Sequence, residues 1–224
     1  MIEFTDVHVR LGPRDVLSGL SLSLTERRVG VVGANGSGKS TLARLINGLA
    51  MPTSGTVTVL GHDTRRHAAR IRREVGFLFT DPDAQIVMPT VAEDVAFSLR
   101  RKGLSAAEVA GRVEQVLSRH GLADHADHPA HQLSGGQKQL LALCSVLVLE
   151  PQILIMDEPT TLLDLRHSRV VAELLSELPQ QVVVVTHDLG LLDSFDRVLV
   201  LDQGRVVADA PPSAALDHYR KLMS

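Results

Sequence analysis

Aromatic residues are scarce in this 224-residue chain: they make up 3% of it, and tryptophan is absent. Proteins that hold single-stranded nucleic acid commonly stack bases on aromatic rings. The formal net charge of −3 also supplies no electrostatic attraction to a polyanion. The composition therefore argues against nucleic acid as a partner.

Cysteine is equally rare, since Cys144 is the single one. A disulfide within the chain is thereby excluded, and this usage is typical of a reducing compartment. Cys144 stands in an apolar segment, so we expect it to be a core residue. The longest apolar run, from Leu140 to Leu149, has about half of the length that a bilayer crossing requires. We therefore do not expect this chain to span a membrane by itself.

Apolar side chains are plentiful, at 44%, and the length suffices for one large domain with a buried core. Residues 2–10 and 15–25 alternate between apolar and polar, which predicts an antiparallel pair of strands. The apolar runs over 152–157 and 182–186 are typical of strands buried in a parallel sheet. Residues 197–208 surround Asp-Gln-Gly and predict a hairpin. The fold class expected from this order is α/β.

One stretch matches the phosphate-binding pattern G-x-x-x-x-G-K-[ST] without a mismatch. It reads Gly33-Ala34-Asn35-Gly36-Ser37-Gly38-Lys39-Ser40-Thr41. Its glycines let the backbone curl so that N–H groups point at a phosphate, and the helix that begins near Gly38 adds its positive end. Lys39 supplies a charge for the β- and γ-phosphates, and the Ser40 hydroxyl is placed to bind Mg²⁺. A predicted buried strand over 28–32 leads into the loop, so the stretch predicts a nucleotide site.

Two acids follow the predicted strand that ends at 157. A carboxylate at the tip of a strand beside the phosphate loop can hold the shell of Mg²⁺, and we assign this role to Asp157. Glu158 is then placed to orient or deprotonate the attacking water. A phosphate loop and an acid alone leave kinases, GTPases, helicases and transport ATPases open.

A second glycine-containing helix start separates these alternatives. Ser134, Gly135, Gly136 and Gln137 open a long apolar helix and make a second anion-binding helix N-terminus, which one nucleotide in one chain does not need. These residues resemble the signature motif of ATP-binding cassette (ABC) ATPases. The spacing to Asp157 and the Asp-Glu-Pro-Thr sequence also match, and the resemblance covers essentially the whole chain.

The resemblance implies how the site is completed. In that family the signature of one chain closes on the γ-phosphate held by the phosphate loop of another chain, so that two chains sandwich two ATP molecules. Asp164, at the end of residues 161–164, stands at the position of a cross-dimer contact. His187 stands at the position of the family's switch histidine, which senses the γ-phosphate. The implied cofactors are ATP and Mg²⁺, with Lys39, Glu158 and His187 as the catalytic residues.

The implied fold is a P-loop NTPase core of the ABC ATPase type in a single domain, residues 1–224. Residues 1–82 and 150–224 would form the nucleotide-binding core, including an N-terminal antiparallel β subdomain. Residues 83–149 would form an inserted helical subdomain that carries the signature. Ser105 and Glu108 predict the capped start of one of its helices, and Thr90 with Glu93 that of another.

Two positions depart from the family pattern. Leu11 stands where the first strand normally ends in an aromatic residue that stacks on adenine, so we expect weaker and less selective binding of adenine. Thr80 stands where the family has a glutamine that reaches Mg²⁺ or the water, and a hydroxyl is too short for this. Gln85 is a candidate substitute at the metal, although relatives carry a glutamine there as well. We expect hydrolysis to persist with reduced coupling to transport.

The segment after Gln85 narrows the choice within the family. Residues 82–85 and 88–97 resemble the ATPase subunits of energy-coupling-factor (ECF) importers, which carry vitamins and transition-metal ions into prokaryotes. The implied partners are a second ATPase chain, identical or paralogous, a transmembrane coupling protein and a substrate-binding membrane protein, at the cytoplasmic face of the plasma membrane. The compact sequence and residues 85–90 favour a biotin importer, with cobalt or nickel importers as the alternative.

Two functions from other classes fit the sequence less well. A cassette protein that clamps nucleic acid predicts a basic stripe or a long coiled-coil insertion, and the sequence shows neither. A small-molecule kinase with a phosphate loop leaves Ser134 and His187 without a role.

Overall fold

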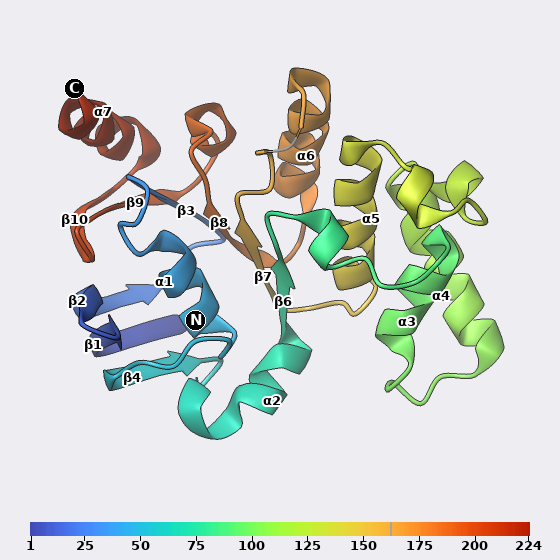
Figure 1. Ribbon diagram of the computed structural model, residues 1–224, viewed down its shortest axis with the longest axis horizontal. Coiled ribbons are helices and arrows are strands. Elements are labelled where there is room, and N and C mark those ends of the chain that lie inside the picture. Colours follow the sequence, from blue (N-terminus) through green and yellow to red (C-terminus); the bar gives the residue numbers. More distant parts are fainter. Residues whose placement is uncertain (162) are drawn as a thin grey trace.

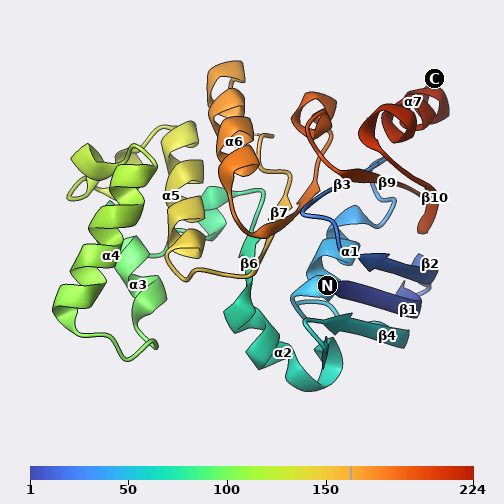
Figure 2. The same cartoon turned by 180° about the vertical axis from the view of Figure 1, so that it is seen from behind.

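The computed structural model of the chain describes residues 1–161 and 163–224, and for residues 165–167 it describes the backbone only. The chain forms two β-sheets, with a group of helices at one end (Figures 1 and 2). The helix that follows the phosphate loop, α1 (Lys39–Ile46), contacts strands of both sheets. The loop therefore lies where the two sheets meet.

A six-stranded sheet forms the centre of the molecule, in the order β10-β9-β3-β8-β7-β6. Its strands are β3 (Arg28–Gly33), β6 (Val75–Leu78), β7 (Ile153–Asp157), β8 (Gln181–Val185), β9 (Arg197–Asp202) and β10 (Arg205–Ala210). All pairs in it are parallel except that of β9 with β10, which is antiparallel. The predicted parallel strands and the predicted hairpin are thus confirmed.

The smaller sheet has the order β2-β1-β4-β5 and is antiparallel. Its strands are β1 (Ile2–Leu11), β2 (Arg14–Leu24), β4 (Ser54–Val59) and β5 (His62–Asp63). The pairing predicted for residues 2–10 and 15–25 is confirmed by β1 and β2. The alternation of apolar and polar residues arises because one face of this sheet packs on the core.

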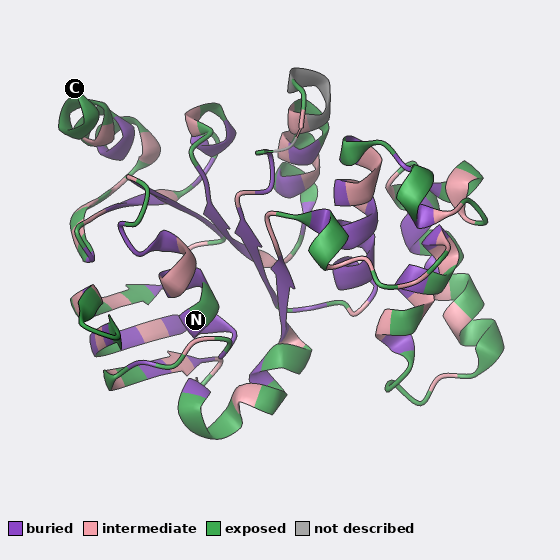
Figure 3. Cartoon of the chain, viewed as in Figure 1, coloured by how far each residue is buried: buried purple, intermediate pink, exposed green. Residues whose placement is uncertain are grey.

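Both faces of the central sheet are covered, which explains its continuous apolar strands. Val183 and Val185 pack into a core shared with α1 and the smaller sheet. Val182 and Val184, on the opposite face, pack into a core shared with the helical region. All four side chains are fully buried, and the central strands are purple along their length in Figure 3. The sheet is therefore a rigid base for the loops at its carboxyl edge.

The chain contains longer helices and short 3₁₀ turns, and three of the longer helices form a separate group. The longer ones besides α1 are α2 (Thr64–Glu74), α3 (Val91–Leu99), α4 (Ala106–Arg119), α5 (Gly135–Leu147), α6 (Leu165–Glu177) and α7 (Pro212–Met223). Short 3₁₀ turns are η1 (Pro82–Ala84), η2 (Ala123–His125), η3 (Ala130–Gln132) and η4 (Leu189–Leu192). In both ribbon views α3, α4 and α5 stand together at the end of the sheet near β6 (Figures 1 and 2). Within residues 1–161 and 163–224, no helix has the length and apolarity needed to cross a membrane.

Two predicted helix starts are present in this group. The Thr90 side chain caps α3 and the Glu93 carboxylate reaches back to the Thr90 N–H at 3.1 Å. Ser105 and Glu108 form the same reciprocal arrangement at the start of α4. Each box satisfies N–H groups that the first turn of a helix leaves without partners.

Cys144 lies in α5 and is fully buried. Burial raises the pKa of its thiol to about 12, so the thiol is protonated at neutral pH. This confirms its interpretation as a core residue.

Arg28, the first residue of β3, hydrogen-bonds to backbone carbonyls at the end of α6 and just after it. Only 6% of the residue is exposed. Its guanidinium donates hydrogen bonds to the carbonyls of Leu175 at 2.8 Å and Gln180 at 2.7 Å, and also to that of Leu178. Carbonyls at a helix C-terminus lack partners within the helix. A planar guanidinium with five donors can satisfy several of them at once.

We predict that Arg28→Lys lowers the free energy of unfolding by about 2–4 kcal/mol, because the ammonium cannot reach all of these buried carbonyls. Urea denaturation followed by circular dichroism measures the change. Arg70→Lys on α2, at an exposed position, is the matched control. A loss for Arg28→Lys no larger than that of the control would contradict this account of the junction.

Candidate nucleotide-binding site

The phosphate loop leaves β3 and enters α1 in a tight curve that only glycine permits at two points. Gly33 has φ 156°, and a Cβ there would stand 2.1 Å from the Leu201 carbonyl oxygen. Gly38 has φ 106°, and a Cβ there would stand 2.7 Å from a methyl group of Leu17. The loop is therefore fixed against the neighbouring β-strands, with the N-terminus of α1 behind it.

Lys39 is held inside this curve. Its ammonium donates to the carbonyl oxygens of Gly33 at 2.8 Å and Ala34 at 3.0 Å. An ammonium has three donors, so one has no partner in the described part of the chain. Burial lowers the pKa of Lys39, while the carboxylates of Glu158 and Asp157 act to raise it. A bound phosphate would supply both the missing acceptor and a compensating charge.

Ser40 and Asp157 meet beside the loop. The Ser40 hydroxyl donates to Asp157 Oδ1 at 2.9 Å, and the Asp157 residue is only 3% exposed. Arg44 Nη2 lies 4.0 Å from the other carboxylate oxygen. The Thr80 hydroxyl donates to the Asp157 backbone oxygen at 2.9 Å. Hydroxyl and carboxylate oxygens are the donors that Mg²⁺ prefers, so these residues fit the metal predicted here.

Glu158 faces His187 across the same edge of the sheet. Glu158 Oε1 lies 3.3 Å from His187 Nε2, and Oε2 accepts the His187 backbone N–H at 3.1 Å. Oε2 also accepts the Thr161 hydroxyl at 3.3 Å. Glu158 has φ 55°, an uncommon conformation for a residue with a side chain, and such conformations concentrate at functional sites. The carboxylate and the imidazole are thus held as one unit.

A hollow of about 750 Å³ lies beside these groups. Asp157 is buried against Ser40 and is not among the residues that line the hollow. Many of the residues predicted for the site line it: Leu11, Asn35, Gly36, Gly38, Lys39, Ser40, Thr41, Thr80, Glu158 and His187. Gly33 and Ser37 lie in the same loop. Ser37 Oγ is buried without a hydrogen-bond partner in the described residues, which marks the loop as built for a polar ligand.

Some predicted site residues do not reach this hollow. Ser134, Gly135, Gly136 and Gln137 form the start of α5 and are not among the residues that line it. Ser134 caps that helix by accepting the Gln137 N–H at 3.3 Å. Within one chain, therefore, the signature and the phosphate loop do not share a cavity.

Gln85 is also absent from the hollow. Its carboxamide oxygen accepts the Phe79 N–H at 3.1 Å, and its nitrogen donates to the Phe77 carbonyl at 3.4 Å. The side chain thus braces the end of β6 and lines a different groove. Asp164 is exposed, and its carbonyl accepts the Ser168 N–H at 2.9 Å. Leu162, in the predicted cross-dimer segment, lies outside the described residues.

Arg14 is a lining residue that the sequence reading missed. Its guanidinium donates to the Gly36 carbonyl at 3.0 Å, and it faces the hollow beside Leu11. The signal was present in the strand pairing, because the turn between β1 and β2 places Arg14 directly opposite Leu11. A guanidinium plane can stack on a base, so Arg14 adds a second surface where adenine would lie.

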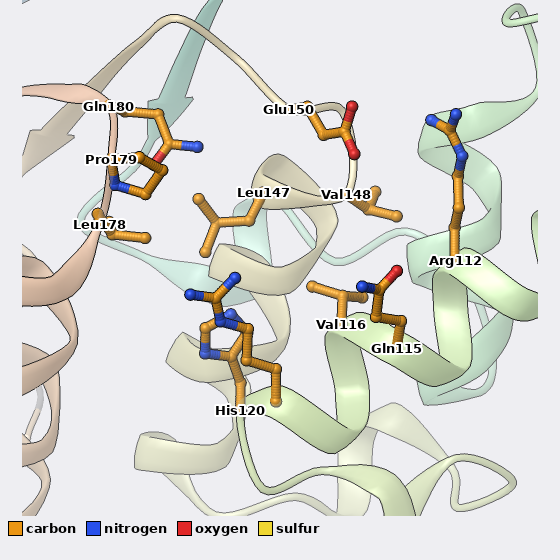
Figure 4. A pocket seen from close by; sticks show the side chains of 11 residues that line it. Arg112, Gln115, Val116, His120, Leu147, Val148, Glu150, Leu178, Pro179 and Gln180 are labelled. Carbon is orange, nitrogen blue, oxygen red and sulfur yellow. The ribbon is translucent and has the colours of Figure 1, made fainter.

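A second hollow, of about 330 Å³, lies between α4, the end of α5 and residues 178–180 (Figure 4). Arg112 and Gln115 line it from α4, and Gln180 lines it from the opposite side. His120 also lines it, and burial together with Arg119 lowers the pKa of this imidazole. None of the predicted site residues contributes to it, so the nucleotide chemistry belongs to the first hollow.

The geometry of the first hollow defines a class of protein. A phosphate loop between a buried parallel strand and a helix, with an acid at the tip of a nearby strand, is the arrangement of P-loop ATPases. The chain belongs to the ABC transporter family, whose profile matches residues 17–161. It is thus an ATP-binding, ATP-hydrolysing cassette, and the predicted family and fold class are confirmed.

Individual relatives are similar along nearly the whole chain. The biotin transport ATP-binding protein BioM of Rhizobium etli is 49% identical over 221 residues, which cover 99% of this chain and 98% of BioM. CbiO1 of Clostridium perfringens, described as part of the ABC transporter complex CbiONQ, has a TM-score of 0.86 at 30% identity. That match covers 99% of this chain and 92% of CbiO1.

A second solved structure is a dimer. The ATP-binding cassette MJ0796, in a post-hydrolysis state bound to ADP and Pi, has a TM-score of 0.81 at 29% identity. The match covers 95% of this chain and 99% of that chain.

We predict that Leu11→Tyr raises the affinity for ATP by about 2–10-fold, because an aromatic ring adds about 0.5–1.5 kcal/mol of stacking on adenine. The preference for ATP over GTP should rise with it. Isothermal titration calorimetry with both nucleotides measures these values. Val207→Tyr on β10, at an exposed position away from the hollow, is the control. If the Leu11→Tyr chain and the unchanged chain have equal affinities for ATP, adenine does not bind beside Leu11.

Proposed function

We propose that the chain is the ATPase subunit of an ECF-type importer and that it works as a dimer whose chains sandwich two ATP molecules. The observation that carries the proposal is the separation of the two anion-binding helix starts. The start of α1 faces the hollow, whereas the start of α5 does not line it. A second chain can bring its own Ser134 and Gly135 to the open side of that hollow. The dimeric state of the similar cassette MJ0796 supports this arrangement.

Within the hollow, the side chains divide the chemistry of hydrolysis among them. Lys39 and the loop N–H groups hold the phosphates, and Ser40 with Asp157 would hold Mg²⁺. Mg²⁺, when bound, neutralises charge on the phosphate oxygens. Glu158 orients a water and accepts its proton as the water oxygen bonds to the γ-phosphorus and the bond from that phosphorus to the bridging oxygen breaks. His187 contacts the γ-phosphate and keeps the Glu158 carboxylate in place, and the products are ADP and phosphate.

The proposed membrane partner binds a groove between the core and the helical region. Leu49, Val87 and Phe97 line this groove, and their exposed fractions are 48%, 61% and 40%. The Arg100 guanidinium lies 5.3 Å from the centre of the Phe97 ring. Apolar side chains gathered at an exposed concave surface are typical of an interface with another protein. We assign the groove to an α-helical segment of the transmembrane coupling protein, which holds this chain at the cytoplasmic face of the membrane.

A short path joins this groove to the nucleotide hollow. Gln85 lines the groove and accepts the Phe79 N–H. The next residue, Thr80, lines the hollow and donates to the Asp157 backbone oxygen. Movement of a partner in the groove can therefore change the position of Asp157. Thr80 makes this link through a short hydroxyl, which supports the expectation that coupling is less tight than in relatives with a glutamine there.

The substrate class proposed is a vitamin, with biotin as the specific candidate. Its support is the similarity to BioM over nearly the full length of both chains. A metal-ion importer is the second candidate, because the similar CbiO1 is part of the complex CbiONQ.

We expect an affinity-tagged chain, expressed with the membrane proteins of its own cell and purified in mild detergent, to retain two transmembrane proteins and bound biotin. Mass spectrometry identifies the proteins and the small molecule. Phe97→Asp should abolish the retention, whereas Val170→Asp on α6, at an equally exposed position, should preserve it. Retention of cobalt or nickel in place of biotin would overturn the vitamin assignment. Unchanged retention by Phe97→Asp would overturn the groove assignment.

A further inference from the structure

The side chains of Gln137, His125 and His128 form a chain of hydrogen bonds next to the start of α5. Gln137 Nε2 lies 2.9 Å from His125 Nε2, and His125 Nδ1 lies 2.8 Å from His128 Nδ1. Neither histidine lines the nucleotide hollow, and neither belongs to a motif recognised in the sequence. This chain of hydrogen bonds nevertheless ends on Gln137, which is part of the signature.

The partners of Gln137 determine where the protons of these hydrogen bonds are. The Ser134 N–H donates to Gln137 Oε1 at 2.9 Å, so the other end of the carboxamide, which faces His125, is the NH₂ group. His125 Nε2 must then accept, and its proton is on Nδ1. His125 Nδ1–H in turn donates a hydrogen bond to His128 Nδ1. The contacts are therefore consistent only with one tautomer of His125.

The hydrogen bonds of His125 and His128 connect Gln137, in the signature, to the start of α3. The His128 carbonyl accepts the Val91 N–H at 3.2 Å, at the first residue of α3. The His128 N–H donates to the His125 carbonyl at 2.9 Å, which holds the two rings in contact. With its oxygen bound to Ser134 and its nitrogen bound to His125, the Gln137 carboxamide has a single orientation. The first turn of α5, whose N–H groups would face a phosphate, is thereby oriented as well.

We propose that His125 is a positioning residue for the signature. It holds Gln137, and through it Ser134, in the orientation that meets the γ-phosphate of the partner chain, while the hydrogen bond to His128 holds the His125 ring in place. This inference rests on the proposed ATP sandwich. It adds to that proposal two residues that contact neither nucleotide.

The test is ATP-driven dimerisation in a chain that carries Glu158→Gln. The role proposed for Glu158 predicts that this variant binds ATP without hydrolysing it. Sedimentation velocity gives the ATP concentration for half-maximal dimer formation. His125→Phe removes the acceptor and should raise that concentration about tenfold, the effect of one lost hydrogen bond. His125→Gln places a carboxamide oxygen near the position of Nε2 and should restore the parental value. His131→Phe, at a nearby exposed position, is the control and should have no effect.

The affinity for ADP distinguishes a positioning role of His125 from a general loss of structure. Calorimetric binding of ADP by the single chain uses the hollow and not the signature, so His125→Phe should leave that affinity unchanged. An equal loss of ADP affinity, or dimerisation as efficient as in the parent, would overturn the proposal. If His125→Phe does not fold, two other variants test the proposal. His128→Ala should weaken dimerisation, and His125→Gln should not. If the Glu158→Gln parent itself fails to dimerise with ATP, the sandwich is wrong.

Discussion

The hydrogen bond between the Ser40 hydroxyl and the Asp157 carboxylate is the contact on which the nucleotide site depends. It joins residues 117 apart in the sequence at 2.9 Å. The contact exists because β3 and β7 lie in one sheet, separated by β8, with their carboxyl ends at the same edge. The loop after β3 and the acids after β7 must then meet, and Glu158 follows at the next position.

The same sheet explains why the site is open on one side. One chain supplies the phosphate loop, Glu158 and His187 around a wide hollow. Its other anion-binding helix start belongs to α5, which packs with α3 and α4 in the helical region. In that region α5 contacts β6, the strand that leads to Thr80, and residues of α3 and α5 line the groove around Phe97. Residues 79–85 therefore lie between the groove and the hollow, because Gln85 lines the first and Thr80 lines the second.

Patterns confined to a few neighbouring residues could be predicted from the sequence. The glycine loop, the capping boxes at Thr90 and Ser105, and the buried strands depend on local spacing, and the structure contains them. The network of Arg28 could not be predicted, because its carbonyl partners lie about 150 residues away at the end of another helix. Gln85 was a candidate metal residue by its type, whereas its hydrogen bonds depend on how the chain turns after β6. Arg14 was missed because its place in the site follows from the pairing of β1 with β2, which sets it opposite Leu11, and not from a motif around it.

The most direct test of the central claim, that the phosphate loop is half of a site completed by a second chain, is ATP trapping by mixed chains. In the Glu158→Gln background, a chain with Lys39→Ala and a chain with Ser134→Arg should each trap no ATP alone. A mixture of the two should trap it, because a mixed dimer retains one site with an intact loop and an intact signature. Trapping by the Ser134→Arg chain alone at the parental level would show that the loop needs no second chain, and would contradict the account.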